Sequence, residues 1–299
     1  MSRLLGIAGV QMEPIAGNAW ETFRKIEMLV HEIGLSYPWV QLILFHELVV
    51  PGFAKFYLQE PGENDLFEAQ TIPGPLSDAL CDLARREKRW LVPGSMYEIE
   101  GNSKYNTALV ISPEGKLITK YRKMFRWLPY EDDLTPGDQL CVFDIPDVGR
   151  LGLCICYDMW YPEVVRTLIW MGAEVILHPT FTPTSDRSLE LILSQANAIM
   201  NQCYFIDING VNTFGGGKSI LVDPDGRVLQ QAGDHEAILT EIIDLDHVTR
   251  TRNYGTIGLA QTLKQLRECS IKFPIYEQGV KNGEGFKQLE PMKLHRRLY

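Results

Sequence analysis

The sequence predicts an α/β fold in which two similar sheets face each other. Three observations support this prediction. Short apolar runs typical of buried strands alternate with segments of helical periodicity. Turn sequences of the Pro-x-Gly type stand once in each half of the chain, at 112–115 and 223–226. The chain has 299 residues, 45% of them hydrophobic, which suffices for one large core.

In the first half, the apolar run at 4–11 predicts an opening strand, and a helix pattern follows. A second apolar run ends at Phe45, just before a polar turn. The expected elements are strand 4–11, helix 18–35, strand 41–45, helix 75–88, strands 89–97, 105–111 and 117–121, and an irregular loop over 123–139.

In the second half, Pro162 suits the first turn of a helix, which closes at Gly172. The helical phase of the apolar residues at 189–200 predicts another helix with one core-facing stripe. The expected elements are strands 140–145 and 150–156, helix 162–171, strand 174–178, helix 187–201, and strands 203–209, 218–222, 227–231 and 237–243.

The chain turns polar after Asp244 and loses regular periodicity there. We therefore expect a main domain over residues 1–254 and a C-terminal arm over 255–299. The arm's apolar residues are spread among charges without a period of their own, which suits a segment that lies on another subunit. The sequence thus predicts a homo-oligomer, at least a dimer.

Composition excludes several classes of function. The formal charge is −9 and the pI is near 5.3, so nucleic-acid binding is not expected. The N-terminus runs straight into a strand pattern and no apolar run approaches membrane-spanning length, so we expect neither a signal peptide nor a membrane span. The six cysteines show no CxxC pairing or metal-ligand spacing, which predicts reduced thiols, a cytoplasmic location and no metal.

Cys156 is the first candidate for chemistry. It follows a short apolar strand and precedes a helix that begins near Pro162, so unpaired N–H groups and a helix dipole should favour its thiolate. The alternative is an inert core cysteine, which is common in a chain of this size. A nucleophilic thiol also needs a base and a group that stabilises an oxyanion.

Two other strand ends supply such groups. Glu47 directly follows an apolar strand, and partial burial should raise its pKa toward a range useful for proton transfer. Lys120, Arg122 and Lys123 crowd the end of strand 117–121; each alone could be a solvated strand edge. In an open α/β fold, however, strand ends converge on one crevice, so the three segments should meet.

The chain resembles the nitrilase-like carbon–nitrogen hydrolase superfamily over nearly its whole length. The resemblance is carried by an ordered set of short motifs: the Phe-His-Glu segment at 45–47, Ile-Pro-Gly-Pro at 72–75, Tyr-Asn-Thr at 105–107, Lys-Tyr-Arg-Lys at 120–123, Pro-Gly-Asp at 136–138, Cys-Tyr-Asp at 156–158 and Pro-Glu at 162–163. It implies a four-layer α-β-β-α sandwich. It also implies that residues 1–254 form a carbon–nitrogen hydrolase domain.

The resemblance implies roles for four residues. Glu47 matches the family's general base, Lys123 its catalytic lysine and Cys156 its nucleophile, while Glu131 matches a second glutamate that lines many of these sites. No metal or organic cofactor is implied. Where the family commonly has proline, this chain has His46, which either replaces a rigid turn residue or adds a titrating group beside the base.

Among the branches, the segment 120–131 with Pro136-Gly137 is similar to aliphatic amidases and formamidases, which implies hydrolysis of a small amide to carboxylate and ammonia through a cysteine thioester. N-carbamoyl amidohydrolase and nitrilase activity are alternatives with the same triad. A catalytically silent binding or assembly subunit is a further alternative, against which the three intact residues argue.

The substrate-binding candidates come from neighbouring segments. The backbone N–H of Tyr157 is a candidate oxyanion donor beside Cys156. His178 and Phe181 follow the next strand and should reach the same crevice, and Tyr57 is a second candidate for lining the acyl pocket. Cys154 should point to the other side of its strand and lie in the core.

Overall fold

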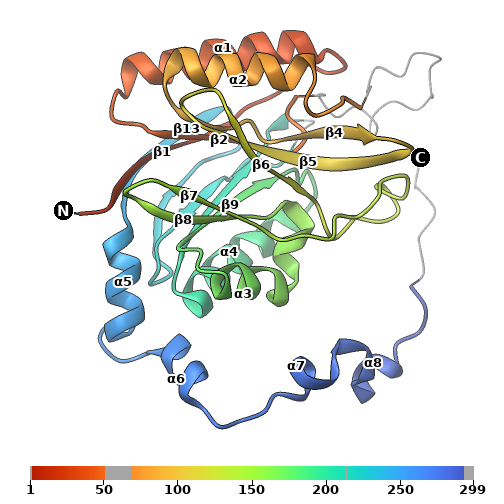
Figure 1. The fold of residues 1–299 in the computed structure, drawn as a ribbon, viewed down its shortest axis with the longest axis vertical. Coiled ribbons are helices and arrows are strands. Elements are labelled where there is room, and N and C mark those ends of the chain that lie inside the picture. The colour runs from red at the N-terminus through yellow and green to blue at the C-terminus, as the bar shows by residue number, and fades with distance from the viewer. Residues whose placement is uncertain (1, 51–68, 213–214, 293–299) are drawn as a thin grey trace.

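The computed structural model describes residues 2–50, 69–212 and 215–292 (Figure 1). Within these ranges the first sheet contains, in spatial order, β13 (Ala237–Asp244), β1 (Leu4–Gln11), β2 (Leu42–Phe45), β3 (Trp90–Val92), β5 (Ser103–Ile111) and β4 (Ser95–Glu100), and β6 (Leu117–Arg122) also pairs with β5. The second sheet contains β12 (Val228–Gln231), β11 (Ile220–Val222), β10 (Tyr204–Asn209), β9 (Val175–Thr180), β8 (Gly149–Leu153) and β7 (Cys141–Ile145).

Helices cover the outer face of each sheet. Helices α1 (Ala19–Ser36) and α2 (Pro75–Glu87) lie over the first sheet, and α3 (Pro162–Trp170) and α4 (Arg187–Asn201) lie over the second (Figure 1). Three apolar clusters separate the layers: one between the sheets and one beneath each helix pair. The four-layer α-β-β-α sandwich expected from the sequence is confirmed.

Helix α1 shows how the sequence builds a layer. The Asn18 side chain accepts a hydrogen bond from Glu21 N at 3.0 Å, which satisfies one free N–H group of the first turn. The residues that α1 buries, Thr22, Ile26, Val30 and Ile33, recur at spacings of three or four and form one stripe against the sheet.

Strand direction decides which chain segments meet. Strands β1, β2 and β3 are parallel, β5 is antiparallel to β3, and β6 is antiparallel to β5. Strand β6 therefore runs in the direction of β2, and both carboxyl ends lie at the same edge of the sheet. In the second sheet, β8, β9 and β10 are parallel and also share a carboxyl edge.

Two predicted strands differ from the observed ones by more than two residues. The strand expected over 89–97 is divided into β3 and β4 by Pro93 and Gly94, where Gly94 has φ +69° and a Cβ would lie 1.9 Å from the carbonyl oxygen of His46. The strand expected over 150–156 ends at Leu153, and Cys156 instead opens a 3₁₀ helix, η1 (Cys156–Trp160).

The sequence predicted no helix after Asp244, because regular periodicity is lost there, but the structure has one. Helix α5 (Leu245–Tyr254) begins there, and the Asp244 side chain caps it by accepting from Asp246 N at 3.0 Å. Only Leu245, Val248 and Thr251 are buried along this helix, so its apolar stripe is too sparse to stand out among charged residues.

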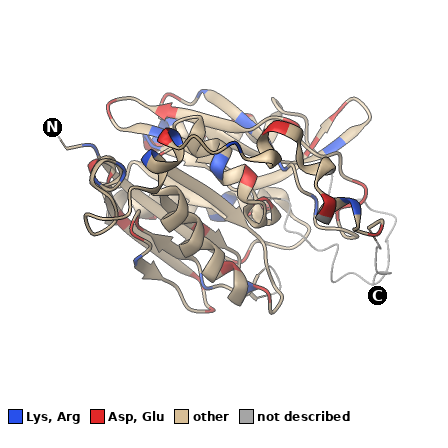
Figure 2. Ribbon diagram, turned by 90° about the horizontal axis from the view of Figure 1, so that it is seen from below, with Lys and Arg blue, Asp and Glu red and all other residues tan. Residues whose placement is uncertain are grey.

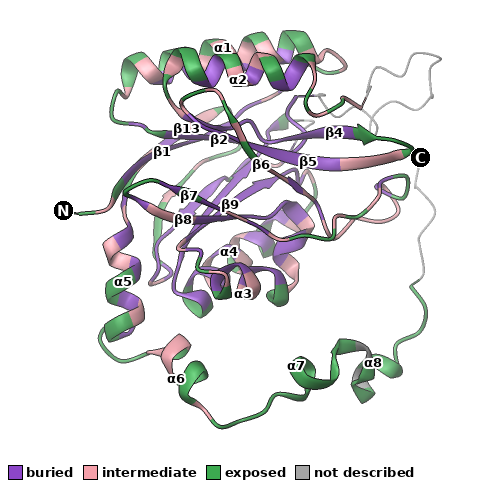
Figure 3. Ribbon diagram, viewed as in Figure 1, coloured by how far each residue is buried: buried purple, intermediate pink, exposed green. Residues whose placement is uncertain are grey.

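Beyond α5 the chain forms only short helices: α6 (Thr262–Glu268), α7 (Pro274–Gln278), η3 (Val280–Asn282) and α8 (Glu284–Lys287). They extend away from the sandwich, and most of their residues are exposed (Figures 1 and 3). Several large apolar side chains are exposed in this segment, including Ile257 and Leu259 at 76% each and Tyr276 at 65%.

Charged residues of both signs are interspersed over the molecule (Figure 2). Among the described residues, no helix is long and apolar enough to cross a bilayer. All six cysteines are free thiols.

Candidate active site

Glu47, Lys123 and Glu131 form a buried ionic cluster where β2 and β6 end. The ammonium Nζ of Lys123 lies 2.9 Å from Glu47 Oε1 and 2.9 Å from Glu131 Oε2. All three side chains are at most 6% exposed. The shared carboxyl edge of β2 and β6 brings the first two residues together, and the loop after β6 returns Glu131 to them.

Asn106 completes this cluster. Its amide Nδ2 donates to Glu47 Oε1 at 2.8 Å and to Glu131 Oε1 at 3.2 Å, and so fixes both carboxylates. Its backbone carbonyl accepts from Lys123 N at 2.9 Å. Sequence reasoning quoted Asn106 within a motif but gave it no role; the signal was a polar residue in a β5 segment whose following residues are buried and mostly apolar.

Burial and mutual charge set the protonation of the cluster. Burial raises the pKa of Glu47, and the neighbouring Glu131 raises it further, while Lys123 opposes both effects. For Lys123, burial favours the neutral amine, but Cys156, Glu131 and Glu47 together raise the pKa of the ammonium well above its ordinary value. The lysine therefore stays charged beside a carboxylate that can take up a proton.

Strand alternation separates the basic residues Lys120 and Arg122 from Lys123. Lys120 and Arg122 point to one face of β6 and both pair with buried Glu98, with Arg122 Nε 2.8 Å from Glu98 Oε2. These two residues stabilise the sheet. Lys123 follows the last residue of β6 and is free of this alternation, so its side chain turns into the cluster.

Cys156 lies at the first position of η1 with the left-handed backbone angle φ +49° and is 8% exposed. Burial raises the pKa of its thiol well above the ordinary value; the charge of Glu47 adds to this effect and Lys123 opposes it. This differs from the sequence expectation that the helix terminus would favour a thiolate. The resting group is a neutral thiol, which needs a base to become nucleophilic.

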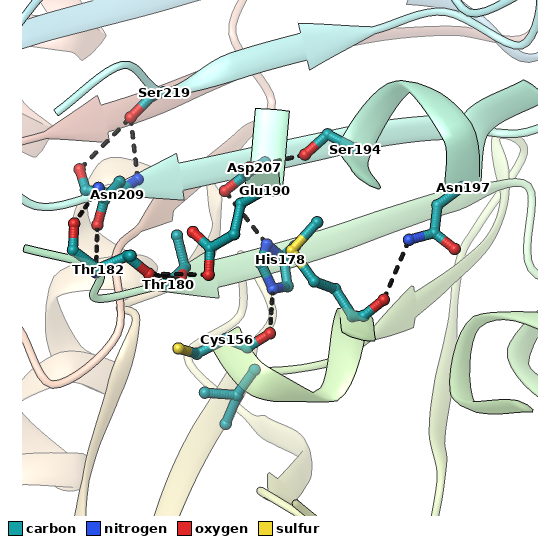
Figure 4. Close-up of polar contacts among 12 residues, drawn as sticks. Cys156, His178, Thr180, Thr182, Glu190, Ser194, Asn197, Asp207, Asn209 and Ser219 are labelled. Atoms are coloured by element: carbon teal, nitrogen blue, oxygen red, sulfur yellow. Dashed lines mark hydrogen bonds and ion pairs between the residues drawn. The ribbon is translucent and has the colours of Figure 1, made fainter. Parts of the chain in front are cut away.

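His178 holds the backbone of Cys156 (Figure 4). Its ring is fully buried, with Nε2 2.9 Å from the Cys156 carbonyl oxygen and Nδ1 3.2 Å from Asp207 Oδ1. Asp207 in turn accepts from Ser194 Oγ at 2.8 Å and Arg187 Nη1 at 2.9 Å. From the sequence, His178 was expected in the substrate crevice. In the structure, both of its ring nitrogens bond to other protein groups, Cys156 and Asp207.

Asp158 anchors the other side of the same turn. It is fully buried, and it accepts from the Tyr121 hydroxyl at 2.7 Å and from the backbone N of Ile155 and of Phe125, both at 2.9 Å. These bonds join the Cys156 turn to β6 and to the loop that follows Lys123. The nucleophile candidate and the lysine are thus fixed relative to each other.

His46 and Cys154 lie close in sequence to Glu47 and Cys156, and each has different surroundings from its neighbour. His46 is fully buried, and burial lowers its pKa to about 4, so it is neutral near pH 7 and adds no charge beside Glu47. Its Nδ1 lies 2.8 Å from the Glu47 carbonyl oxygen. Cys154 is fully buried in the core beneath α3 and α4, as expected. Strand alternation is not the reason, because residues two apart share a face of a strand and β8 already ends at Leu153.

A small pocket opens beside Cys156. Its wall includes four aromatic residues and two carboxylates: Trp127, Tyr157, Trp160, Phe181, Asp186 and Glu190. Tyr157 and Phe181 were expected at the crevice from the sequence; the other four were not assigned there. Tyr57, the remaining pocket candidate, lies outside the described residues.

One group within the described ranges offers three ligands of the kind that metals bind. The ligand atoms of Asp223, Asp225 and His247 lie within 4.8 Å of one another, at the β11–β12 turn and on α5. They already have partners: Asp225 Oδ2 is 3.0 Å from His247 Nε2, and Asp223 Oδ1 accepts from two backbone N–H groups of its own turn. Their part in the fold is to close this hairpin.

Relatives of the chain were found by sequence comparison. It is 31% identical over 199 residues to omega-amidase NIT2 of Mus musculus, covering 62% of this chain and 72% of the relative. It is 30% identical over 189 residues to a formamidase of Bacillus cereus (strain B4264), covering 62% of this chain and 55% of the relative, so it spans only about half of that protein's length.

Solved structures share the fold. Nit3 of Saccharomyces cerevisiae, a member of branch 10 of the nitrilase superfamily, aligns with a TM-score of 0.75 at 25% identity over 85% of this chain and 94% of its own. A carbon-nitrogen hydrolase from Helicobacter pylori G27 aligns with a TM-score of 0.79 at 24% identity over 94% and 99%, respectively. A sequence profile described as carbon-nitrogen hydrolase matches residues 6–253. The chain therefore belongs to the carbon-nitrogen hydrolase family, within the nitrilase superfamily.

Proposed function

We propose that this protein hydrolyses a small amide to a carboxylate and ammonia through a thioester on Cys156. The observation that carries the proposal is the buried contact between Glu47 and Lys123 at 2.9 Å, beside a cysteine that opens onto a pocket. Base, cation and thiol are the three groups that cysteine acyl transfer requires. The resemblance of the chain to an omega-amidase and a formamidase supports an amide as the substrate.

Acylation begins with proton transfer from the Cys156 thiol to Glu47, whose raised pKa suits it to accept a proton. The thiolate sulfur attacks the amide carbonyl carbon, and the carbonyl π electrons move onto oxygen. The ammonium of Lys123 and the backbone N–H of Tyr157 stabilise this oxyanion. One donor of this kind contributes about 3–4 kcal/mol to transition-state stabilisation.

The C–N bond then breaks as Glu47 returns its proton to the leaving nitrogen, which departs as ammonia. In deacylation Glu47 takes a proton from water, and the hydroxide attacks the thioester carbonyl. The C–S bond breaks, the proton returns to sulfur, and a carboxylic acid leaves. Glu131 keeps Lys123 charged through both steps and is placed to accept from the substrate NH₂ group.

Two alternatives use the same triad: hydrolysis of an N-carbamoyl compound and hydrolysis of a nitrile. Ammonia release from a panel of short amides, N-carbamoyl compounds and nitriles separates these activities, and we expect amides to be the best substrates. Absence of turnover on all three classes would favour a silent binding or assembly subunit instead.

We also propose that the protein works as a homo-oligomer, at least a dimer, in the reducing cytoplasm. The exposed apolar residues of 255–292 support the oligomer, because a monomer would leave them in water. The six free thiols support a reducing compartment.

A further inference from the structure

We propose that the pocket beside Cys156 selects amides whose acyl chain carries a positive charge, such as a short ω-ammonium amide. The proposal rests on the amide hydrolysis proposed above and names the substrate class of that same site. Two features of the pocket wall carry it: a pair of carboxylates and a set of aromatic rings.

The carboxylates come from the start of helix α4. Asp186 is the residue before the helix, and Glu190 lies four residues later, so both are on the same face. Glu190 is 2% exposed, and its Oε1 accepts from Thr182 Oγ1 at 3.0 Å and from Trp160 Nε1 at 3.5 Å. Asp186 is half-buried and is bonded by the neighbouring Thr184 hydroxyl. The pocket wall is therefore acidic.

The cation next to Asp186 in the chain is bonded to other protein groups. Arg187 is 3% exposed, and each of its guanidinium nitrogens donates a hydrogen bond within the protein. Nε donates to Gly217 O, Nη1 to Glu190 and Asp207, and Nη2 to Lys218 O. Arg187 offsets the charge of buried Asp207 together with part of the charge of Glu190. Asp186 has no such cation among the described residues.

Among the residues that the structure describes, an anionic acyl group finds no cationic partner in this pocket. Of the described residues that line it, none is lysine, arginine or histidine. Lys123 is already held between Glu47 and Glu131. A substrate carboxylate would face Asp186, which no described cation compensates, whereas an ammonium would be attracted by it. The charge of Glu190 is partly offset by Arg187 and adds less to this attraction.

The aromatic lining favours the same charge. The rings of Trp127, Tyr157, Trp160 and Phe181 carry negative potential on their faces, and cations bind such faces, tryptophan best of all. The Trp160 ring is fixed by its bond to Glu190, and the Trp127 ring stacks on Tyr130 with centroids 4.7 Å apart. The pocket is small and suits only a short chain.

Three matched amides test the proposal: 4-aminobutanamide, its neutral isostere pentanamide, and the monoamide of glutaric acid. We expect kcat/KM at pH 7 and low salt to be about tenfold higher for the ammonium amide than for the neutral one. The carboxylate should be the poorest substrate. Raising the salt concentration should narrow the difference between the charged substrates.

The variant Asp186→Asn should reduce the ratio of kcat/KM for the ammonium amide to kcat/KM for pentanamide about fivefold, mainly by raising KM for the ammonium amide. Asp82→Asn is the matched control: it removes one exposed carboxylate from α2, in the opposite outer layer, and should leave the preference unchanged. An equal effect of both variants would contradict the role given to Asp186.

Binding separates this proposal from the proposed reaction. In Cys156→Ala, calorimetry with the three amides measures recognition without turnover, and the ammonium amide should bind most tightly. Preference for the neutral or anionic amide in kinetics and in binding overturns the inference and leaves amide hydrolysis standing. Preferential binding of the ammonium amide by a protein that releases no ammonia from any amide supports the pocket and overturns the reaction.

Discussion

Lys123 Nζ lies 2.9 Å from Glu47 Oε1 although 75 residues separate them in the chain and both side chains are almost fully buried. Removing one member of such a pair leaves the other charge buried without compensation, which typically costs about 3–5 kcal/mol of folding free energy. This cost distinguishes the ionic cluster from Cys156, whose side chain is small and uncharged in the resting protein. Substitutions in the ionic cluster should therefore lower the free energy of unfolding, whereas substitutions of Cys156 should leave it nearly unchanged.

Cys156→Ser should abolish turnover and leave the fold intact, because it removes the sulfur nucleophile and creates little cavity. Cys154→Ala should instead lower the melting temperature and retain most of the rate, because Cys154 is a core residue. Ammonia release and thermal unfolding measure both. Wild-type activity of Cys156→Ser would contradict the mechanism, and loss of rate in Cys154→Ala at an unchanged melting temperature would identify the other thiol as the nucleophile.

Glu131→Gln should reduce acylation by at least about a hundredfold, because the ammonium of Lys123 loses one of its two carboxylates in a site that excludes water. Cys156 should still react with a small alkylating reagent, since Glu47 is retained. Glu98→Gln is a control in which a buried carboxylate that pairs with Lys120 and Arg122 is lost outside the site. If Glu131→Gln folds normally but resists alkylation, Glu131 takes part in thiol activation.

His178 is expected to act as a positioning residue. His178→Phe keeps a ring but cannot donate to the Cys156 carbonyl, so the left-handed turn at Cys156 loses a constraint that offsets strain of about 1–3 kcal/mol. We expect kcat to fall by about one to two orders of magnitude with a smaller change in KM, and Cys156 alkylation to slow in parallel. His178→Gln, which restores a donor, should recover part of both. Reduced stability with an unchanged alkylation rate would leave His178 a purely structural role.

The pH dependence follows from Glu47. Its pKa is raised above the ordinary 4.5, so the carboxylate needed to accept the thiol proton is lost as pH falls through that raised value. As pH falls, kcat/KM and the rate of Cys156 alkylation should decrease together. The midpoint of both decreases should be the same and should lie above pH 4.5. His46 does not produce this decrease, because its pKa is lowered to about 4 and it is neutral there. His46→Asn should leave the decrease in place, and its disappearance in that variant would reassign the titration.

The C-terminal segment is expected to be ordered against a second copy of the chain. Truncation after residue 254 removes the exposed Ile257, Leu259 and Tyr276, and should shift the mass from light scattering from that of a dimer or larger oligomer to that of a monomer, below the 34.0 kDa of the full chain, at micromolar concentration. A full-length monomer, or a truncated protein that remains oligomeric and equally stable, would contradict the role given to residues 255–299.

The sequence by itself determined the layers, because hydrophobic period and turn residues act locally. The period of α1 and the turns that end in Gly115 (φ +74°) and Gly226 (φ +83°) are visible without any partner. The apolar stripe expected to face the core from α4 is wrong: Leu189 is 50% and Ile192 63% exposed, and the helix instead buries a mostly polar face against the second sheet. Local reasoning failed where an element depends on contacts from afar. Helix α5 has only three buried residues, and the division between β3 and β4 depends on how closely Gly94 approaches the His46 carbonyl.

The same division holds for the site. Strand ends singled out Glu47, Cys156 and a run of basic residues, and the family resemblance pointed to Lys123 within that run. The physical reason came only from the tertiary structure, since Lys120 and Arg122 pair with Glu98 from another strand. The protonation of Cys156 was also decided by the fold: burial and Glu47 raise the pKa of its thiol, and they outweigh the local effect of a helix terminus. Burial and distant charges are properties of the packed chain, and no local sequence pattern encodes them.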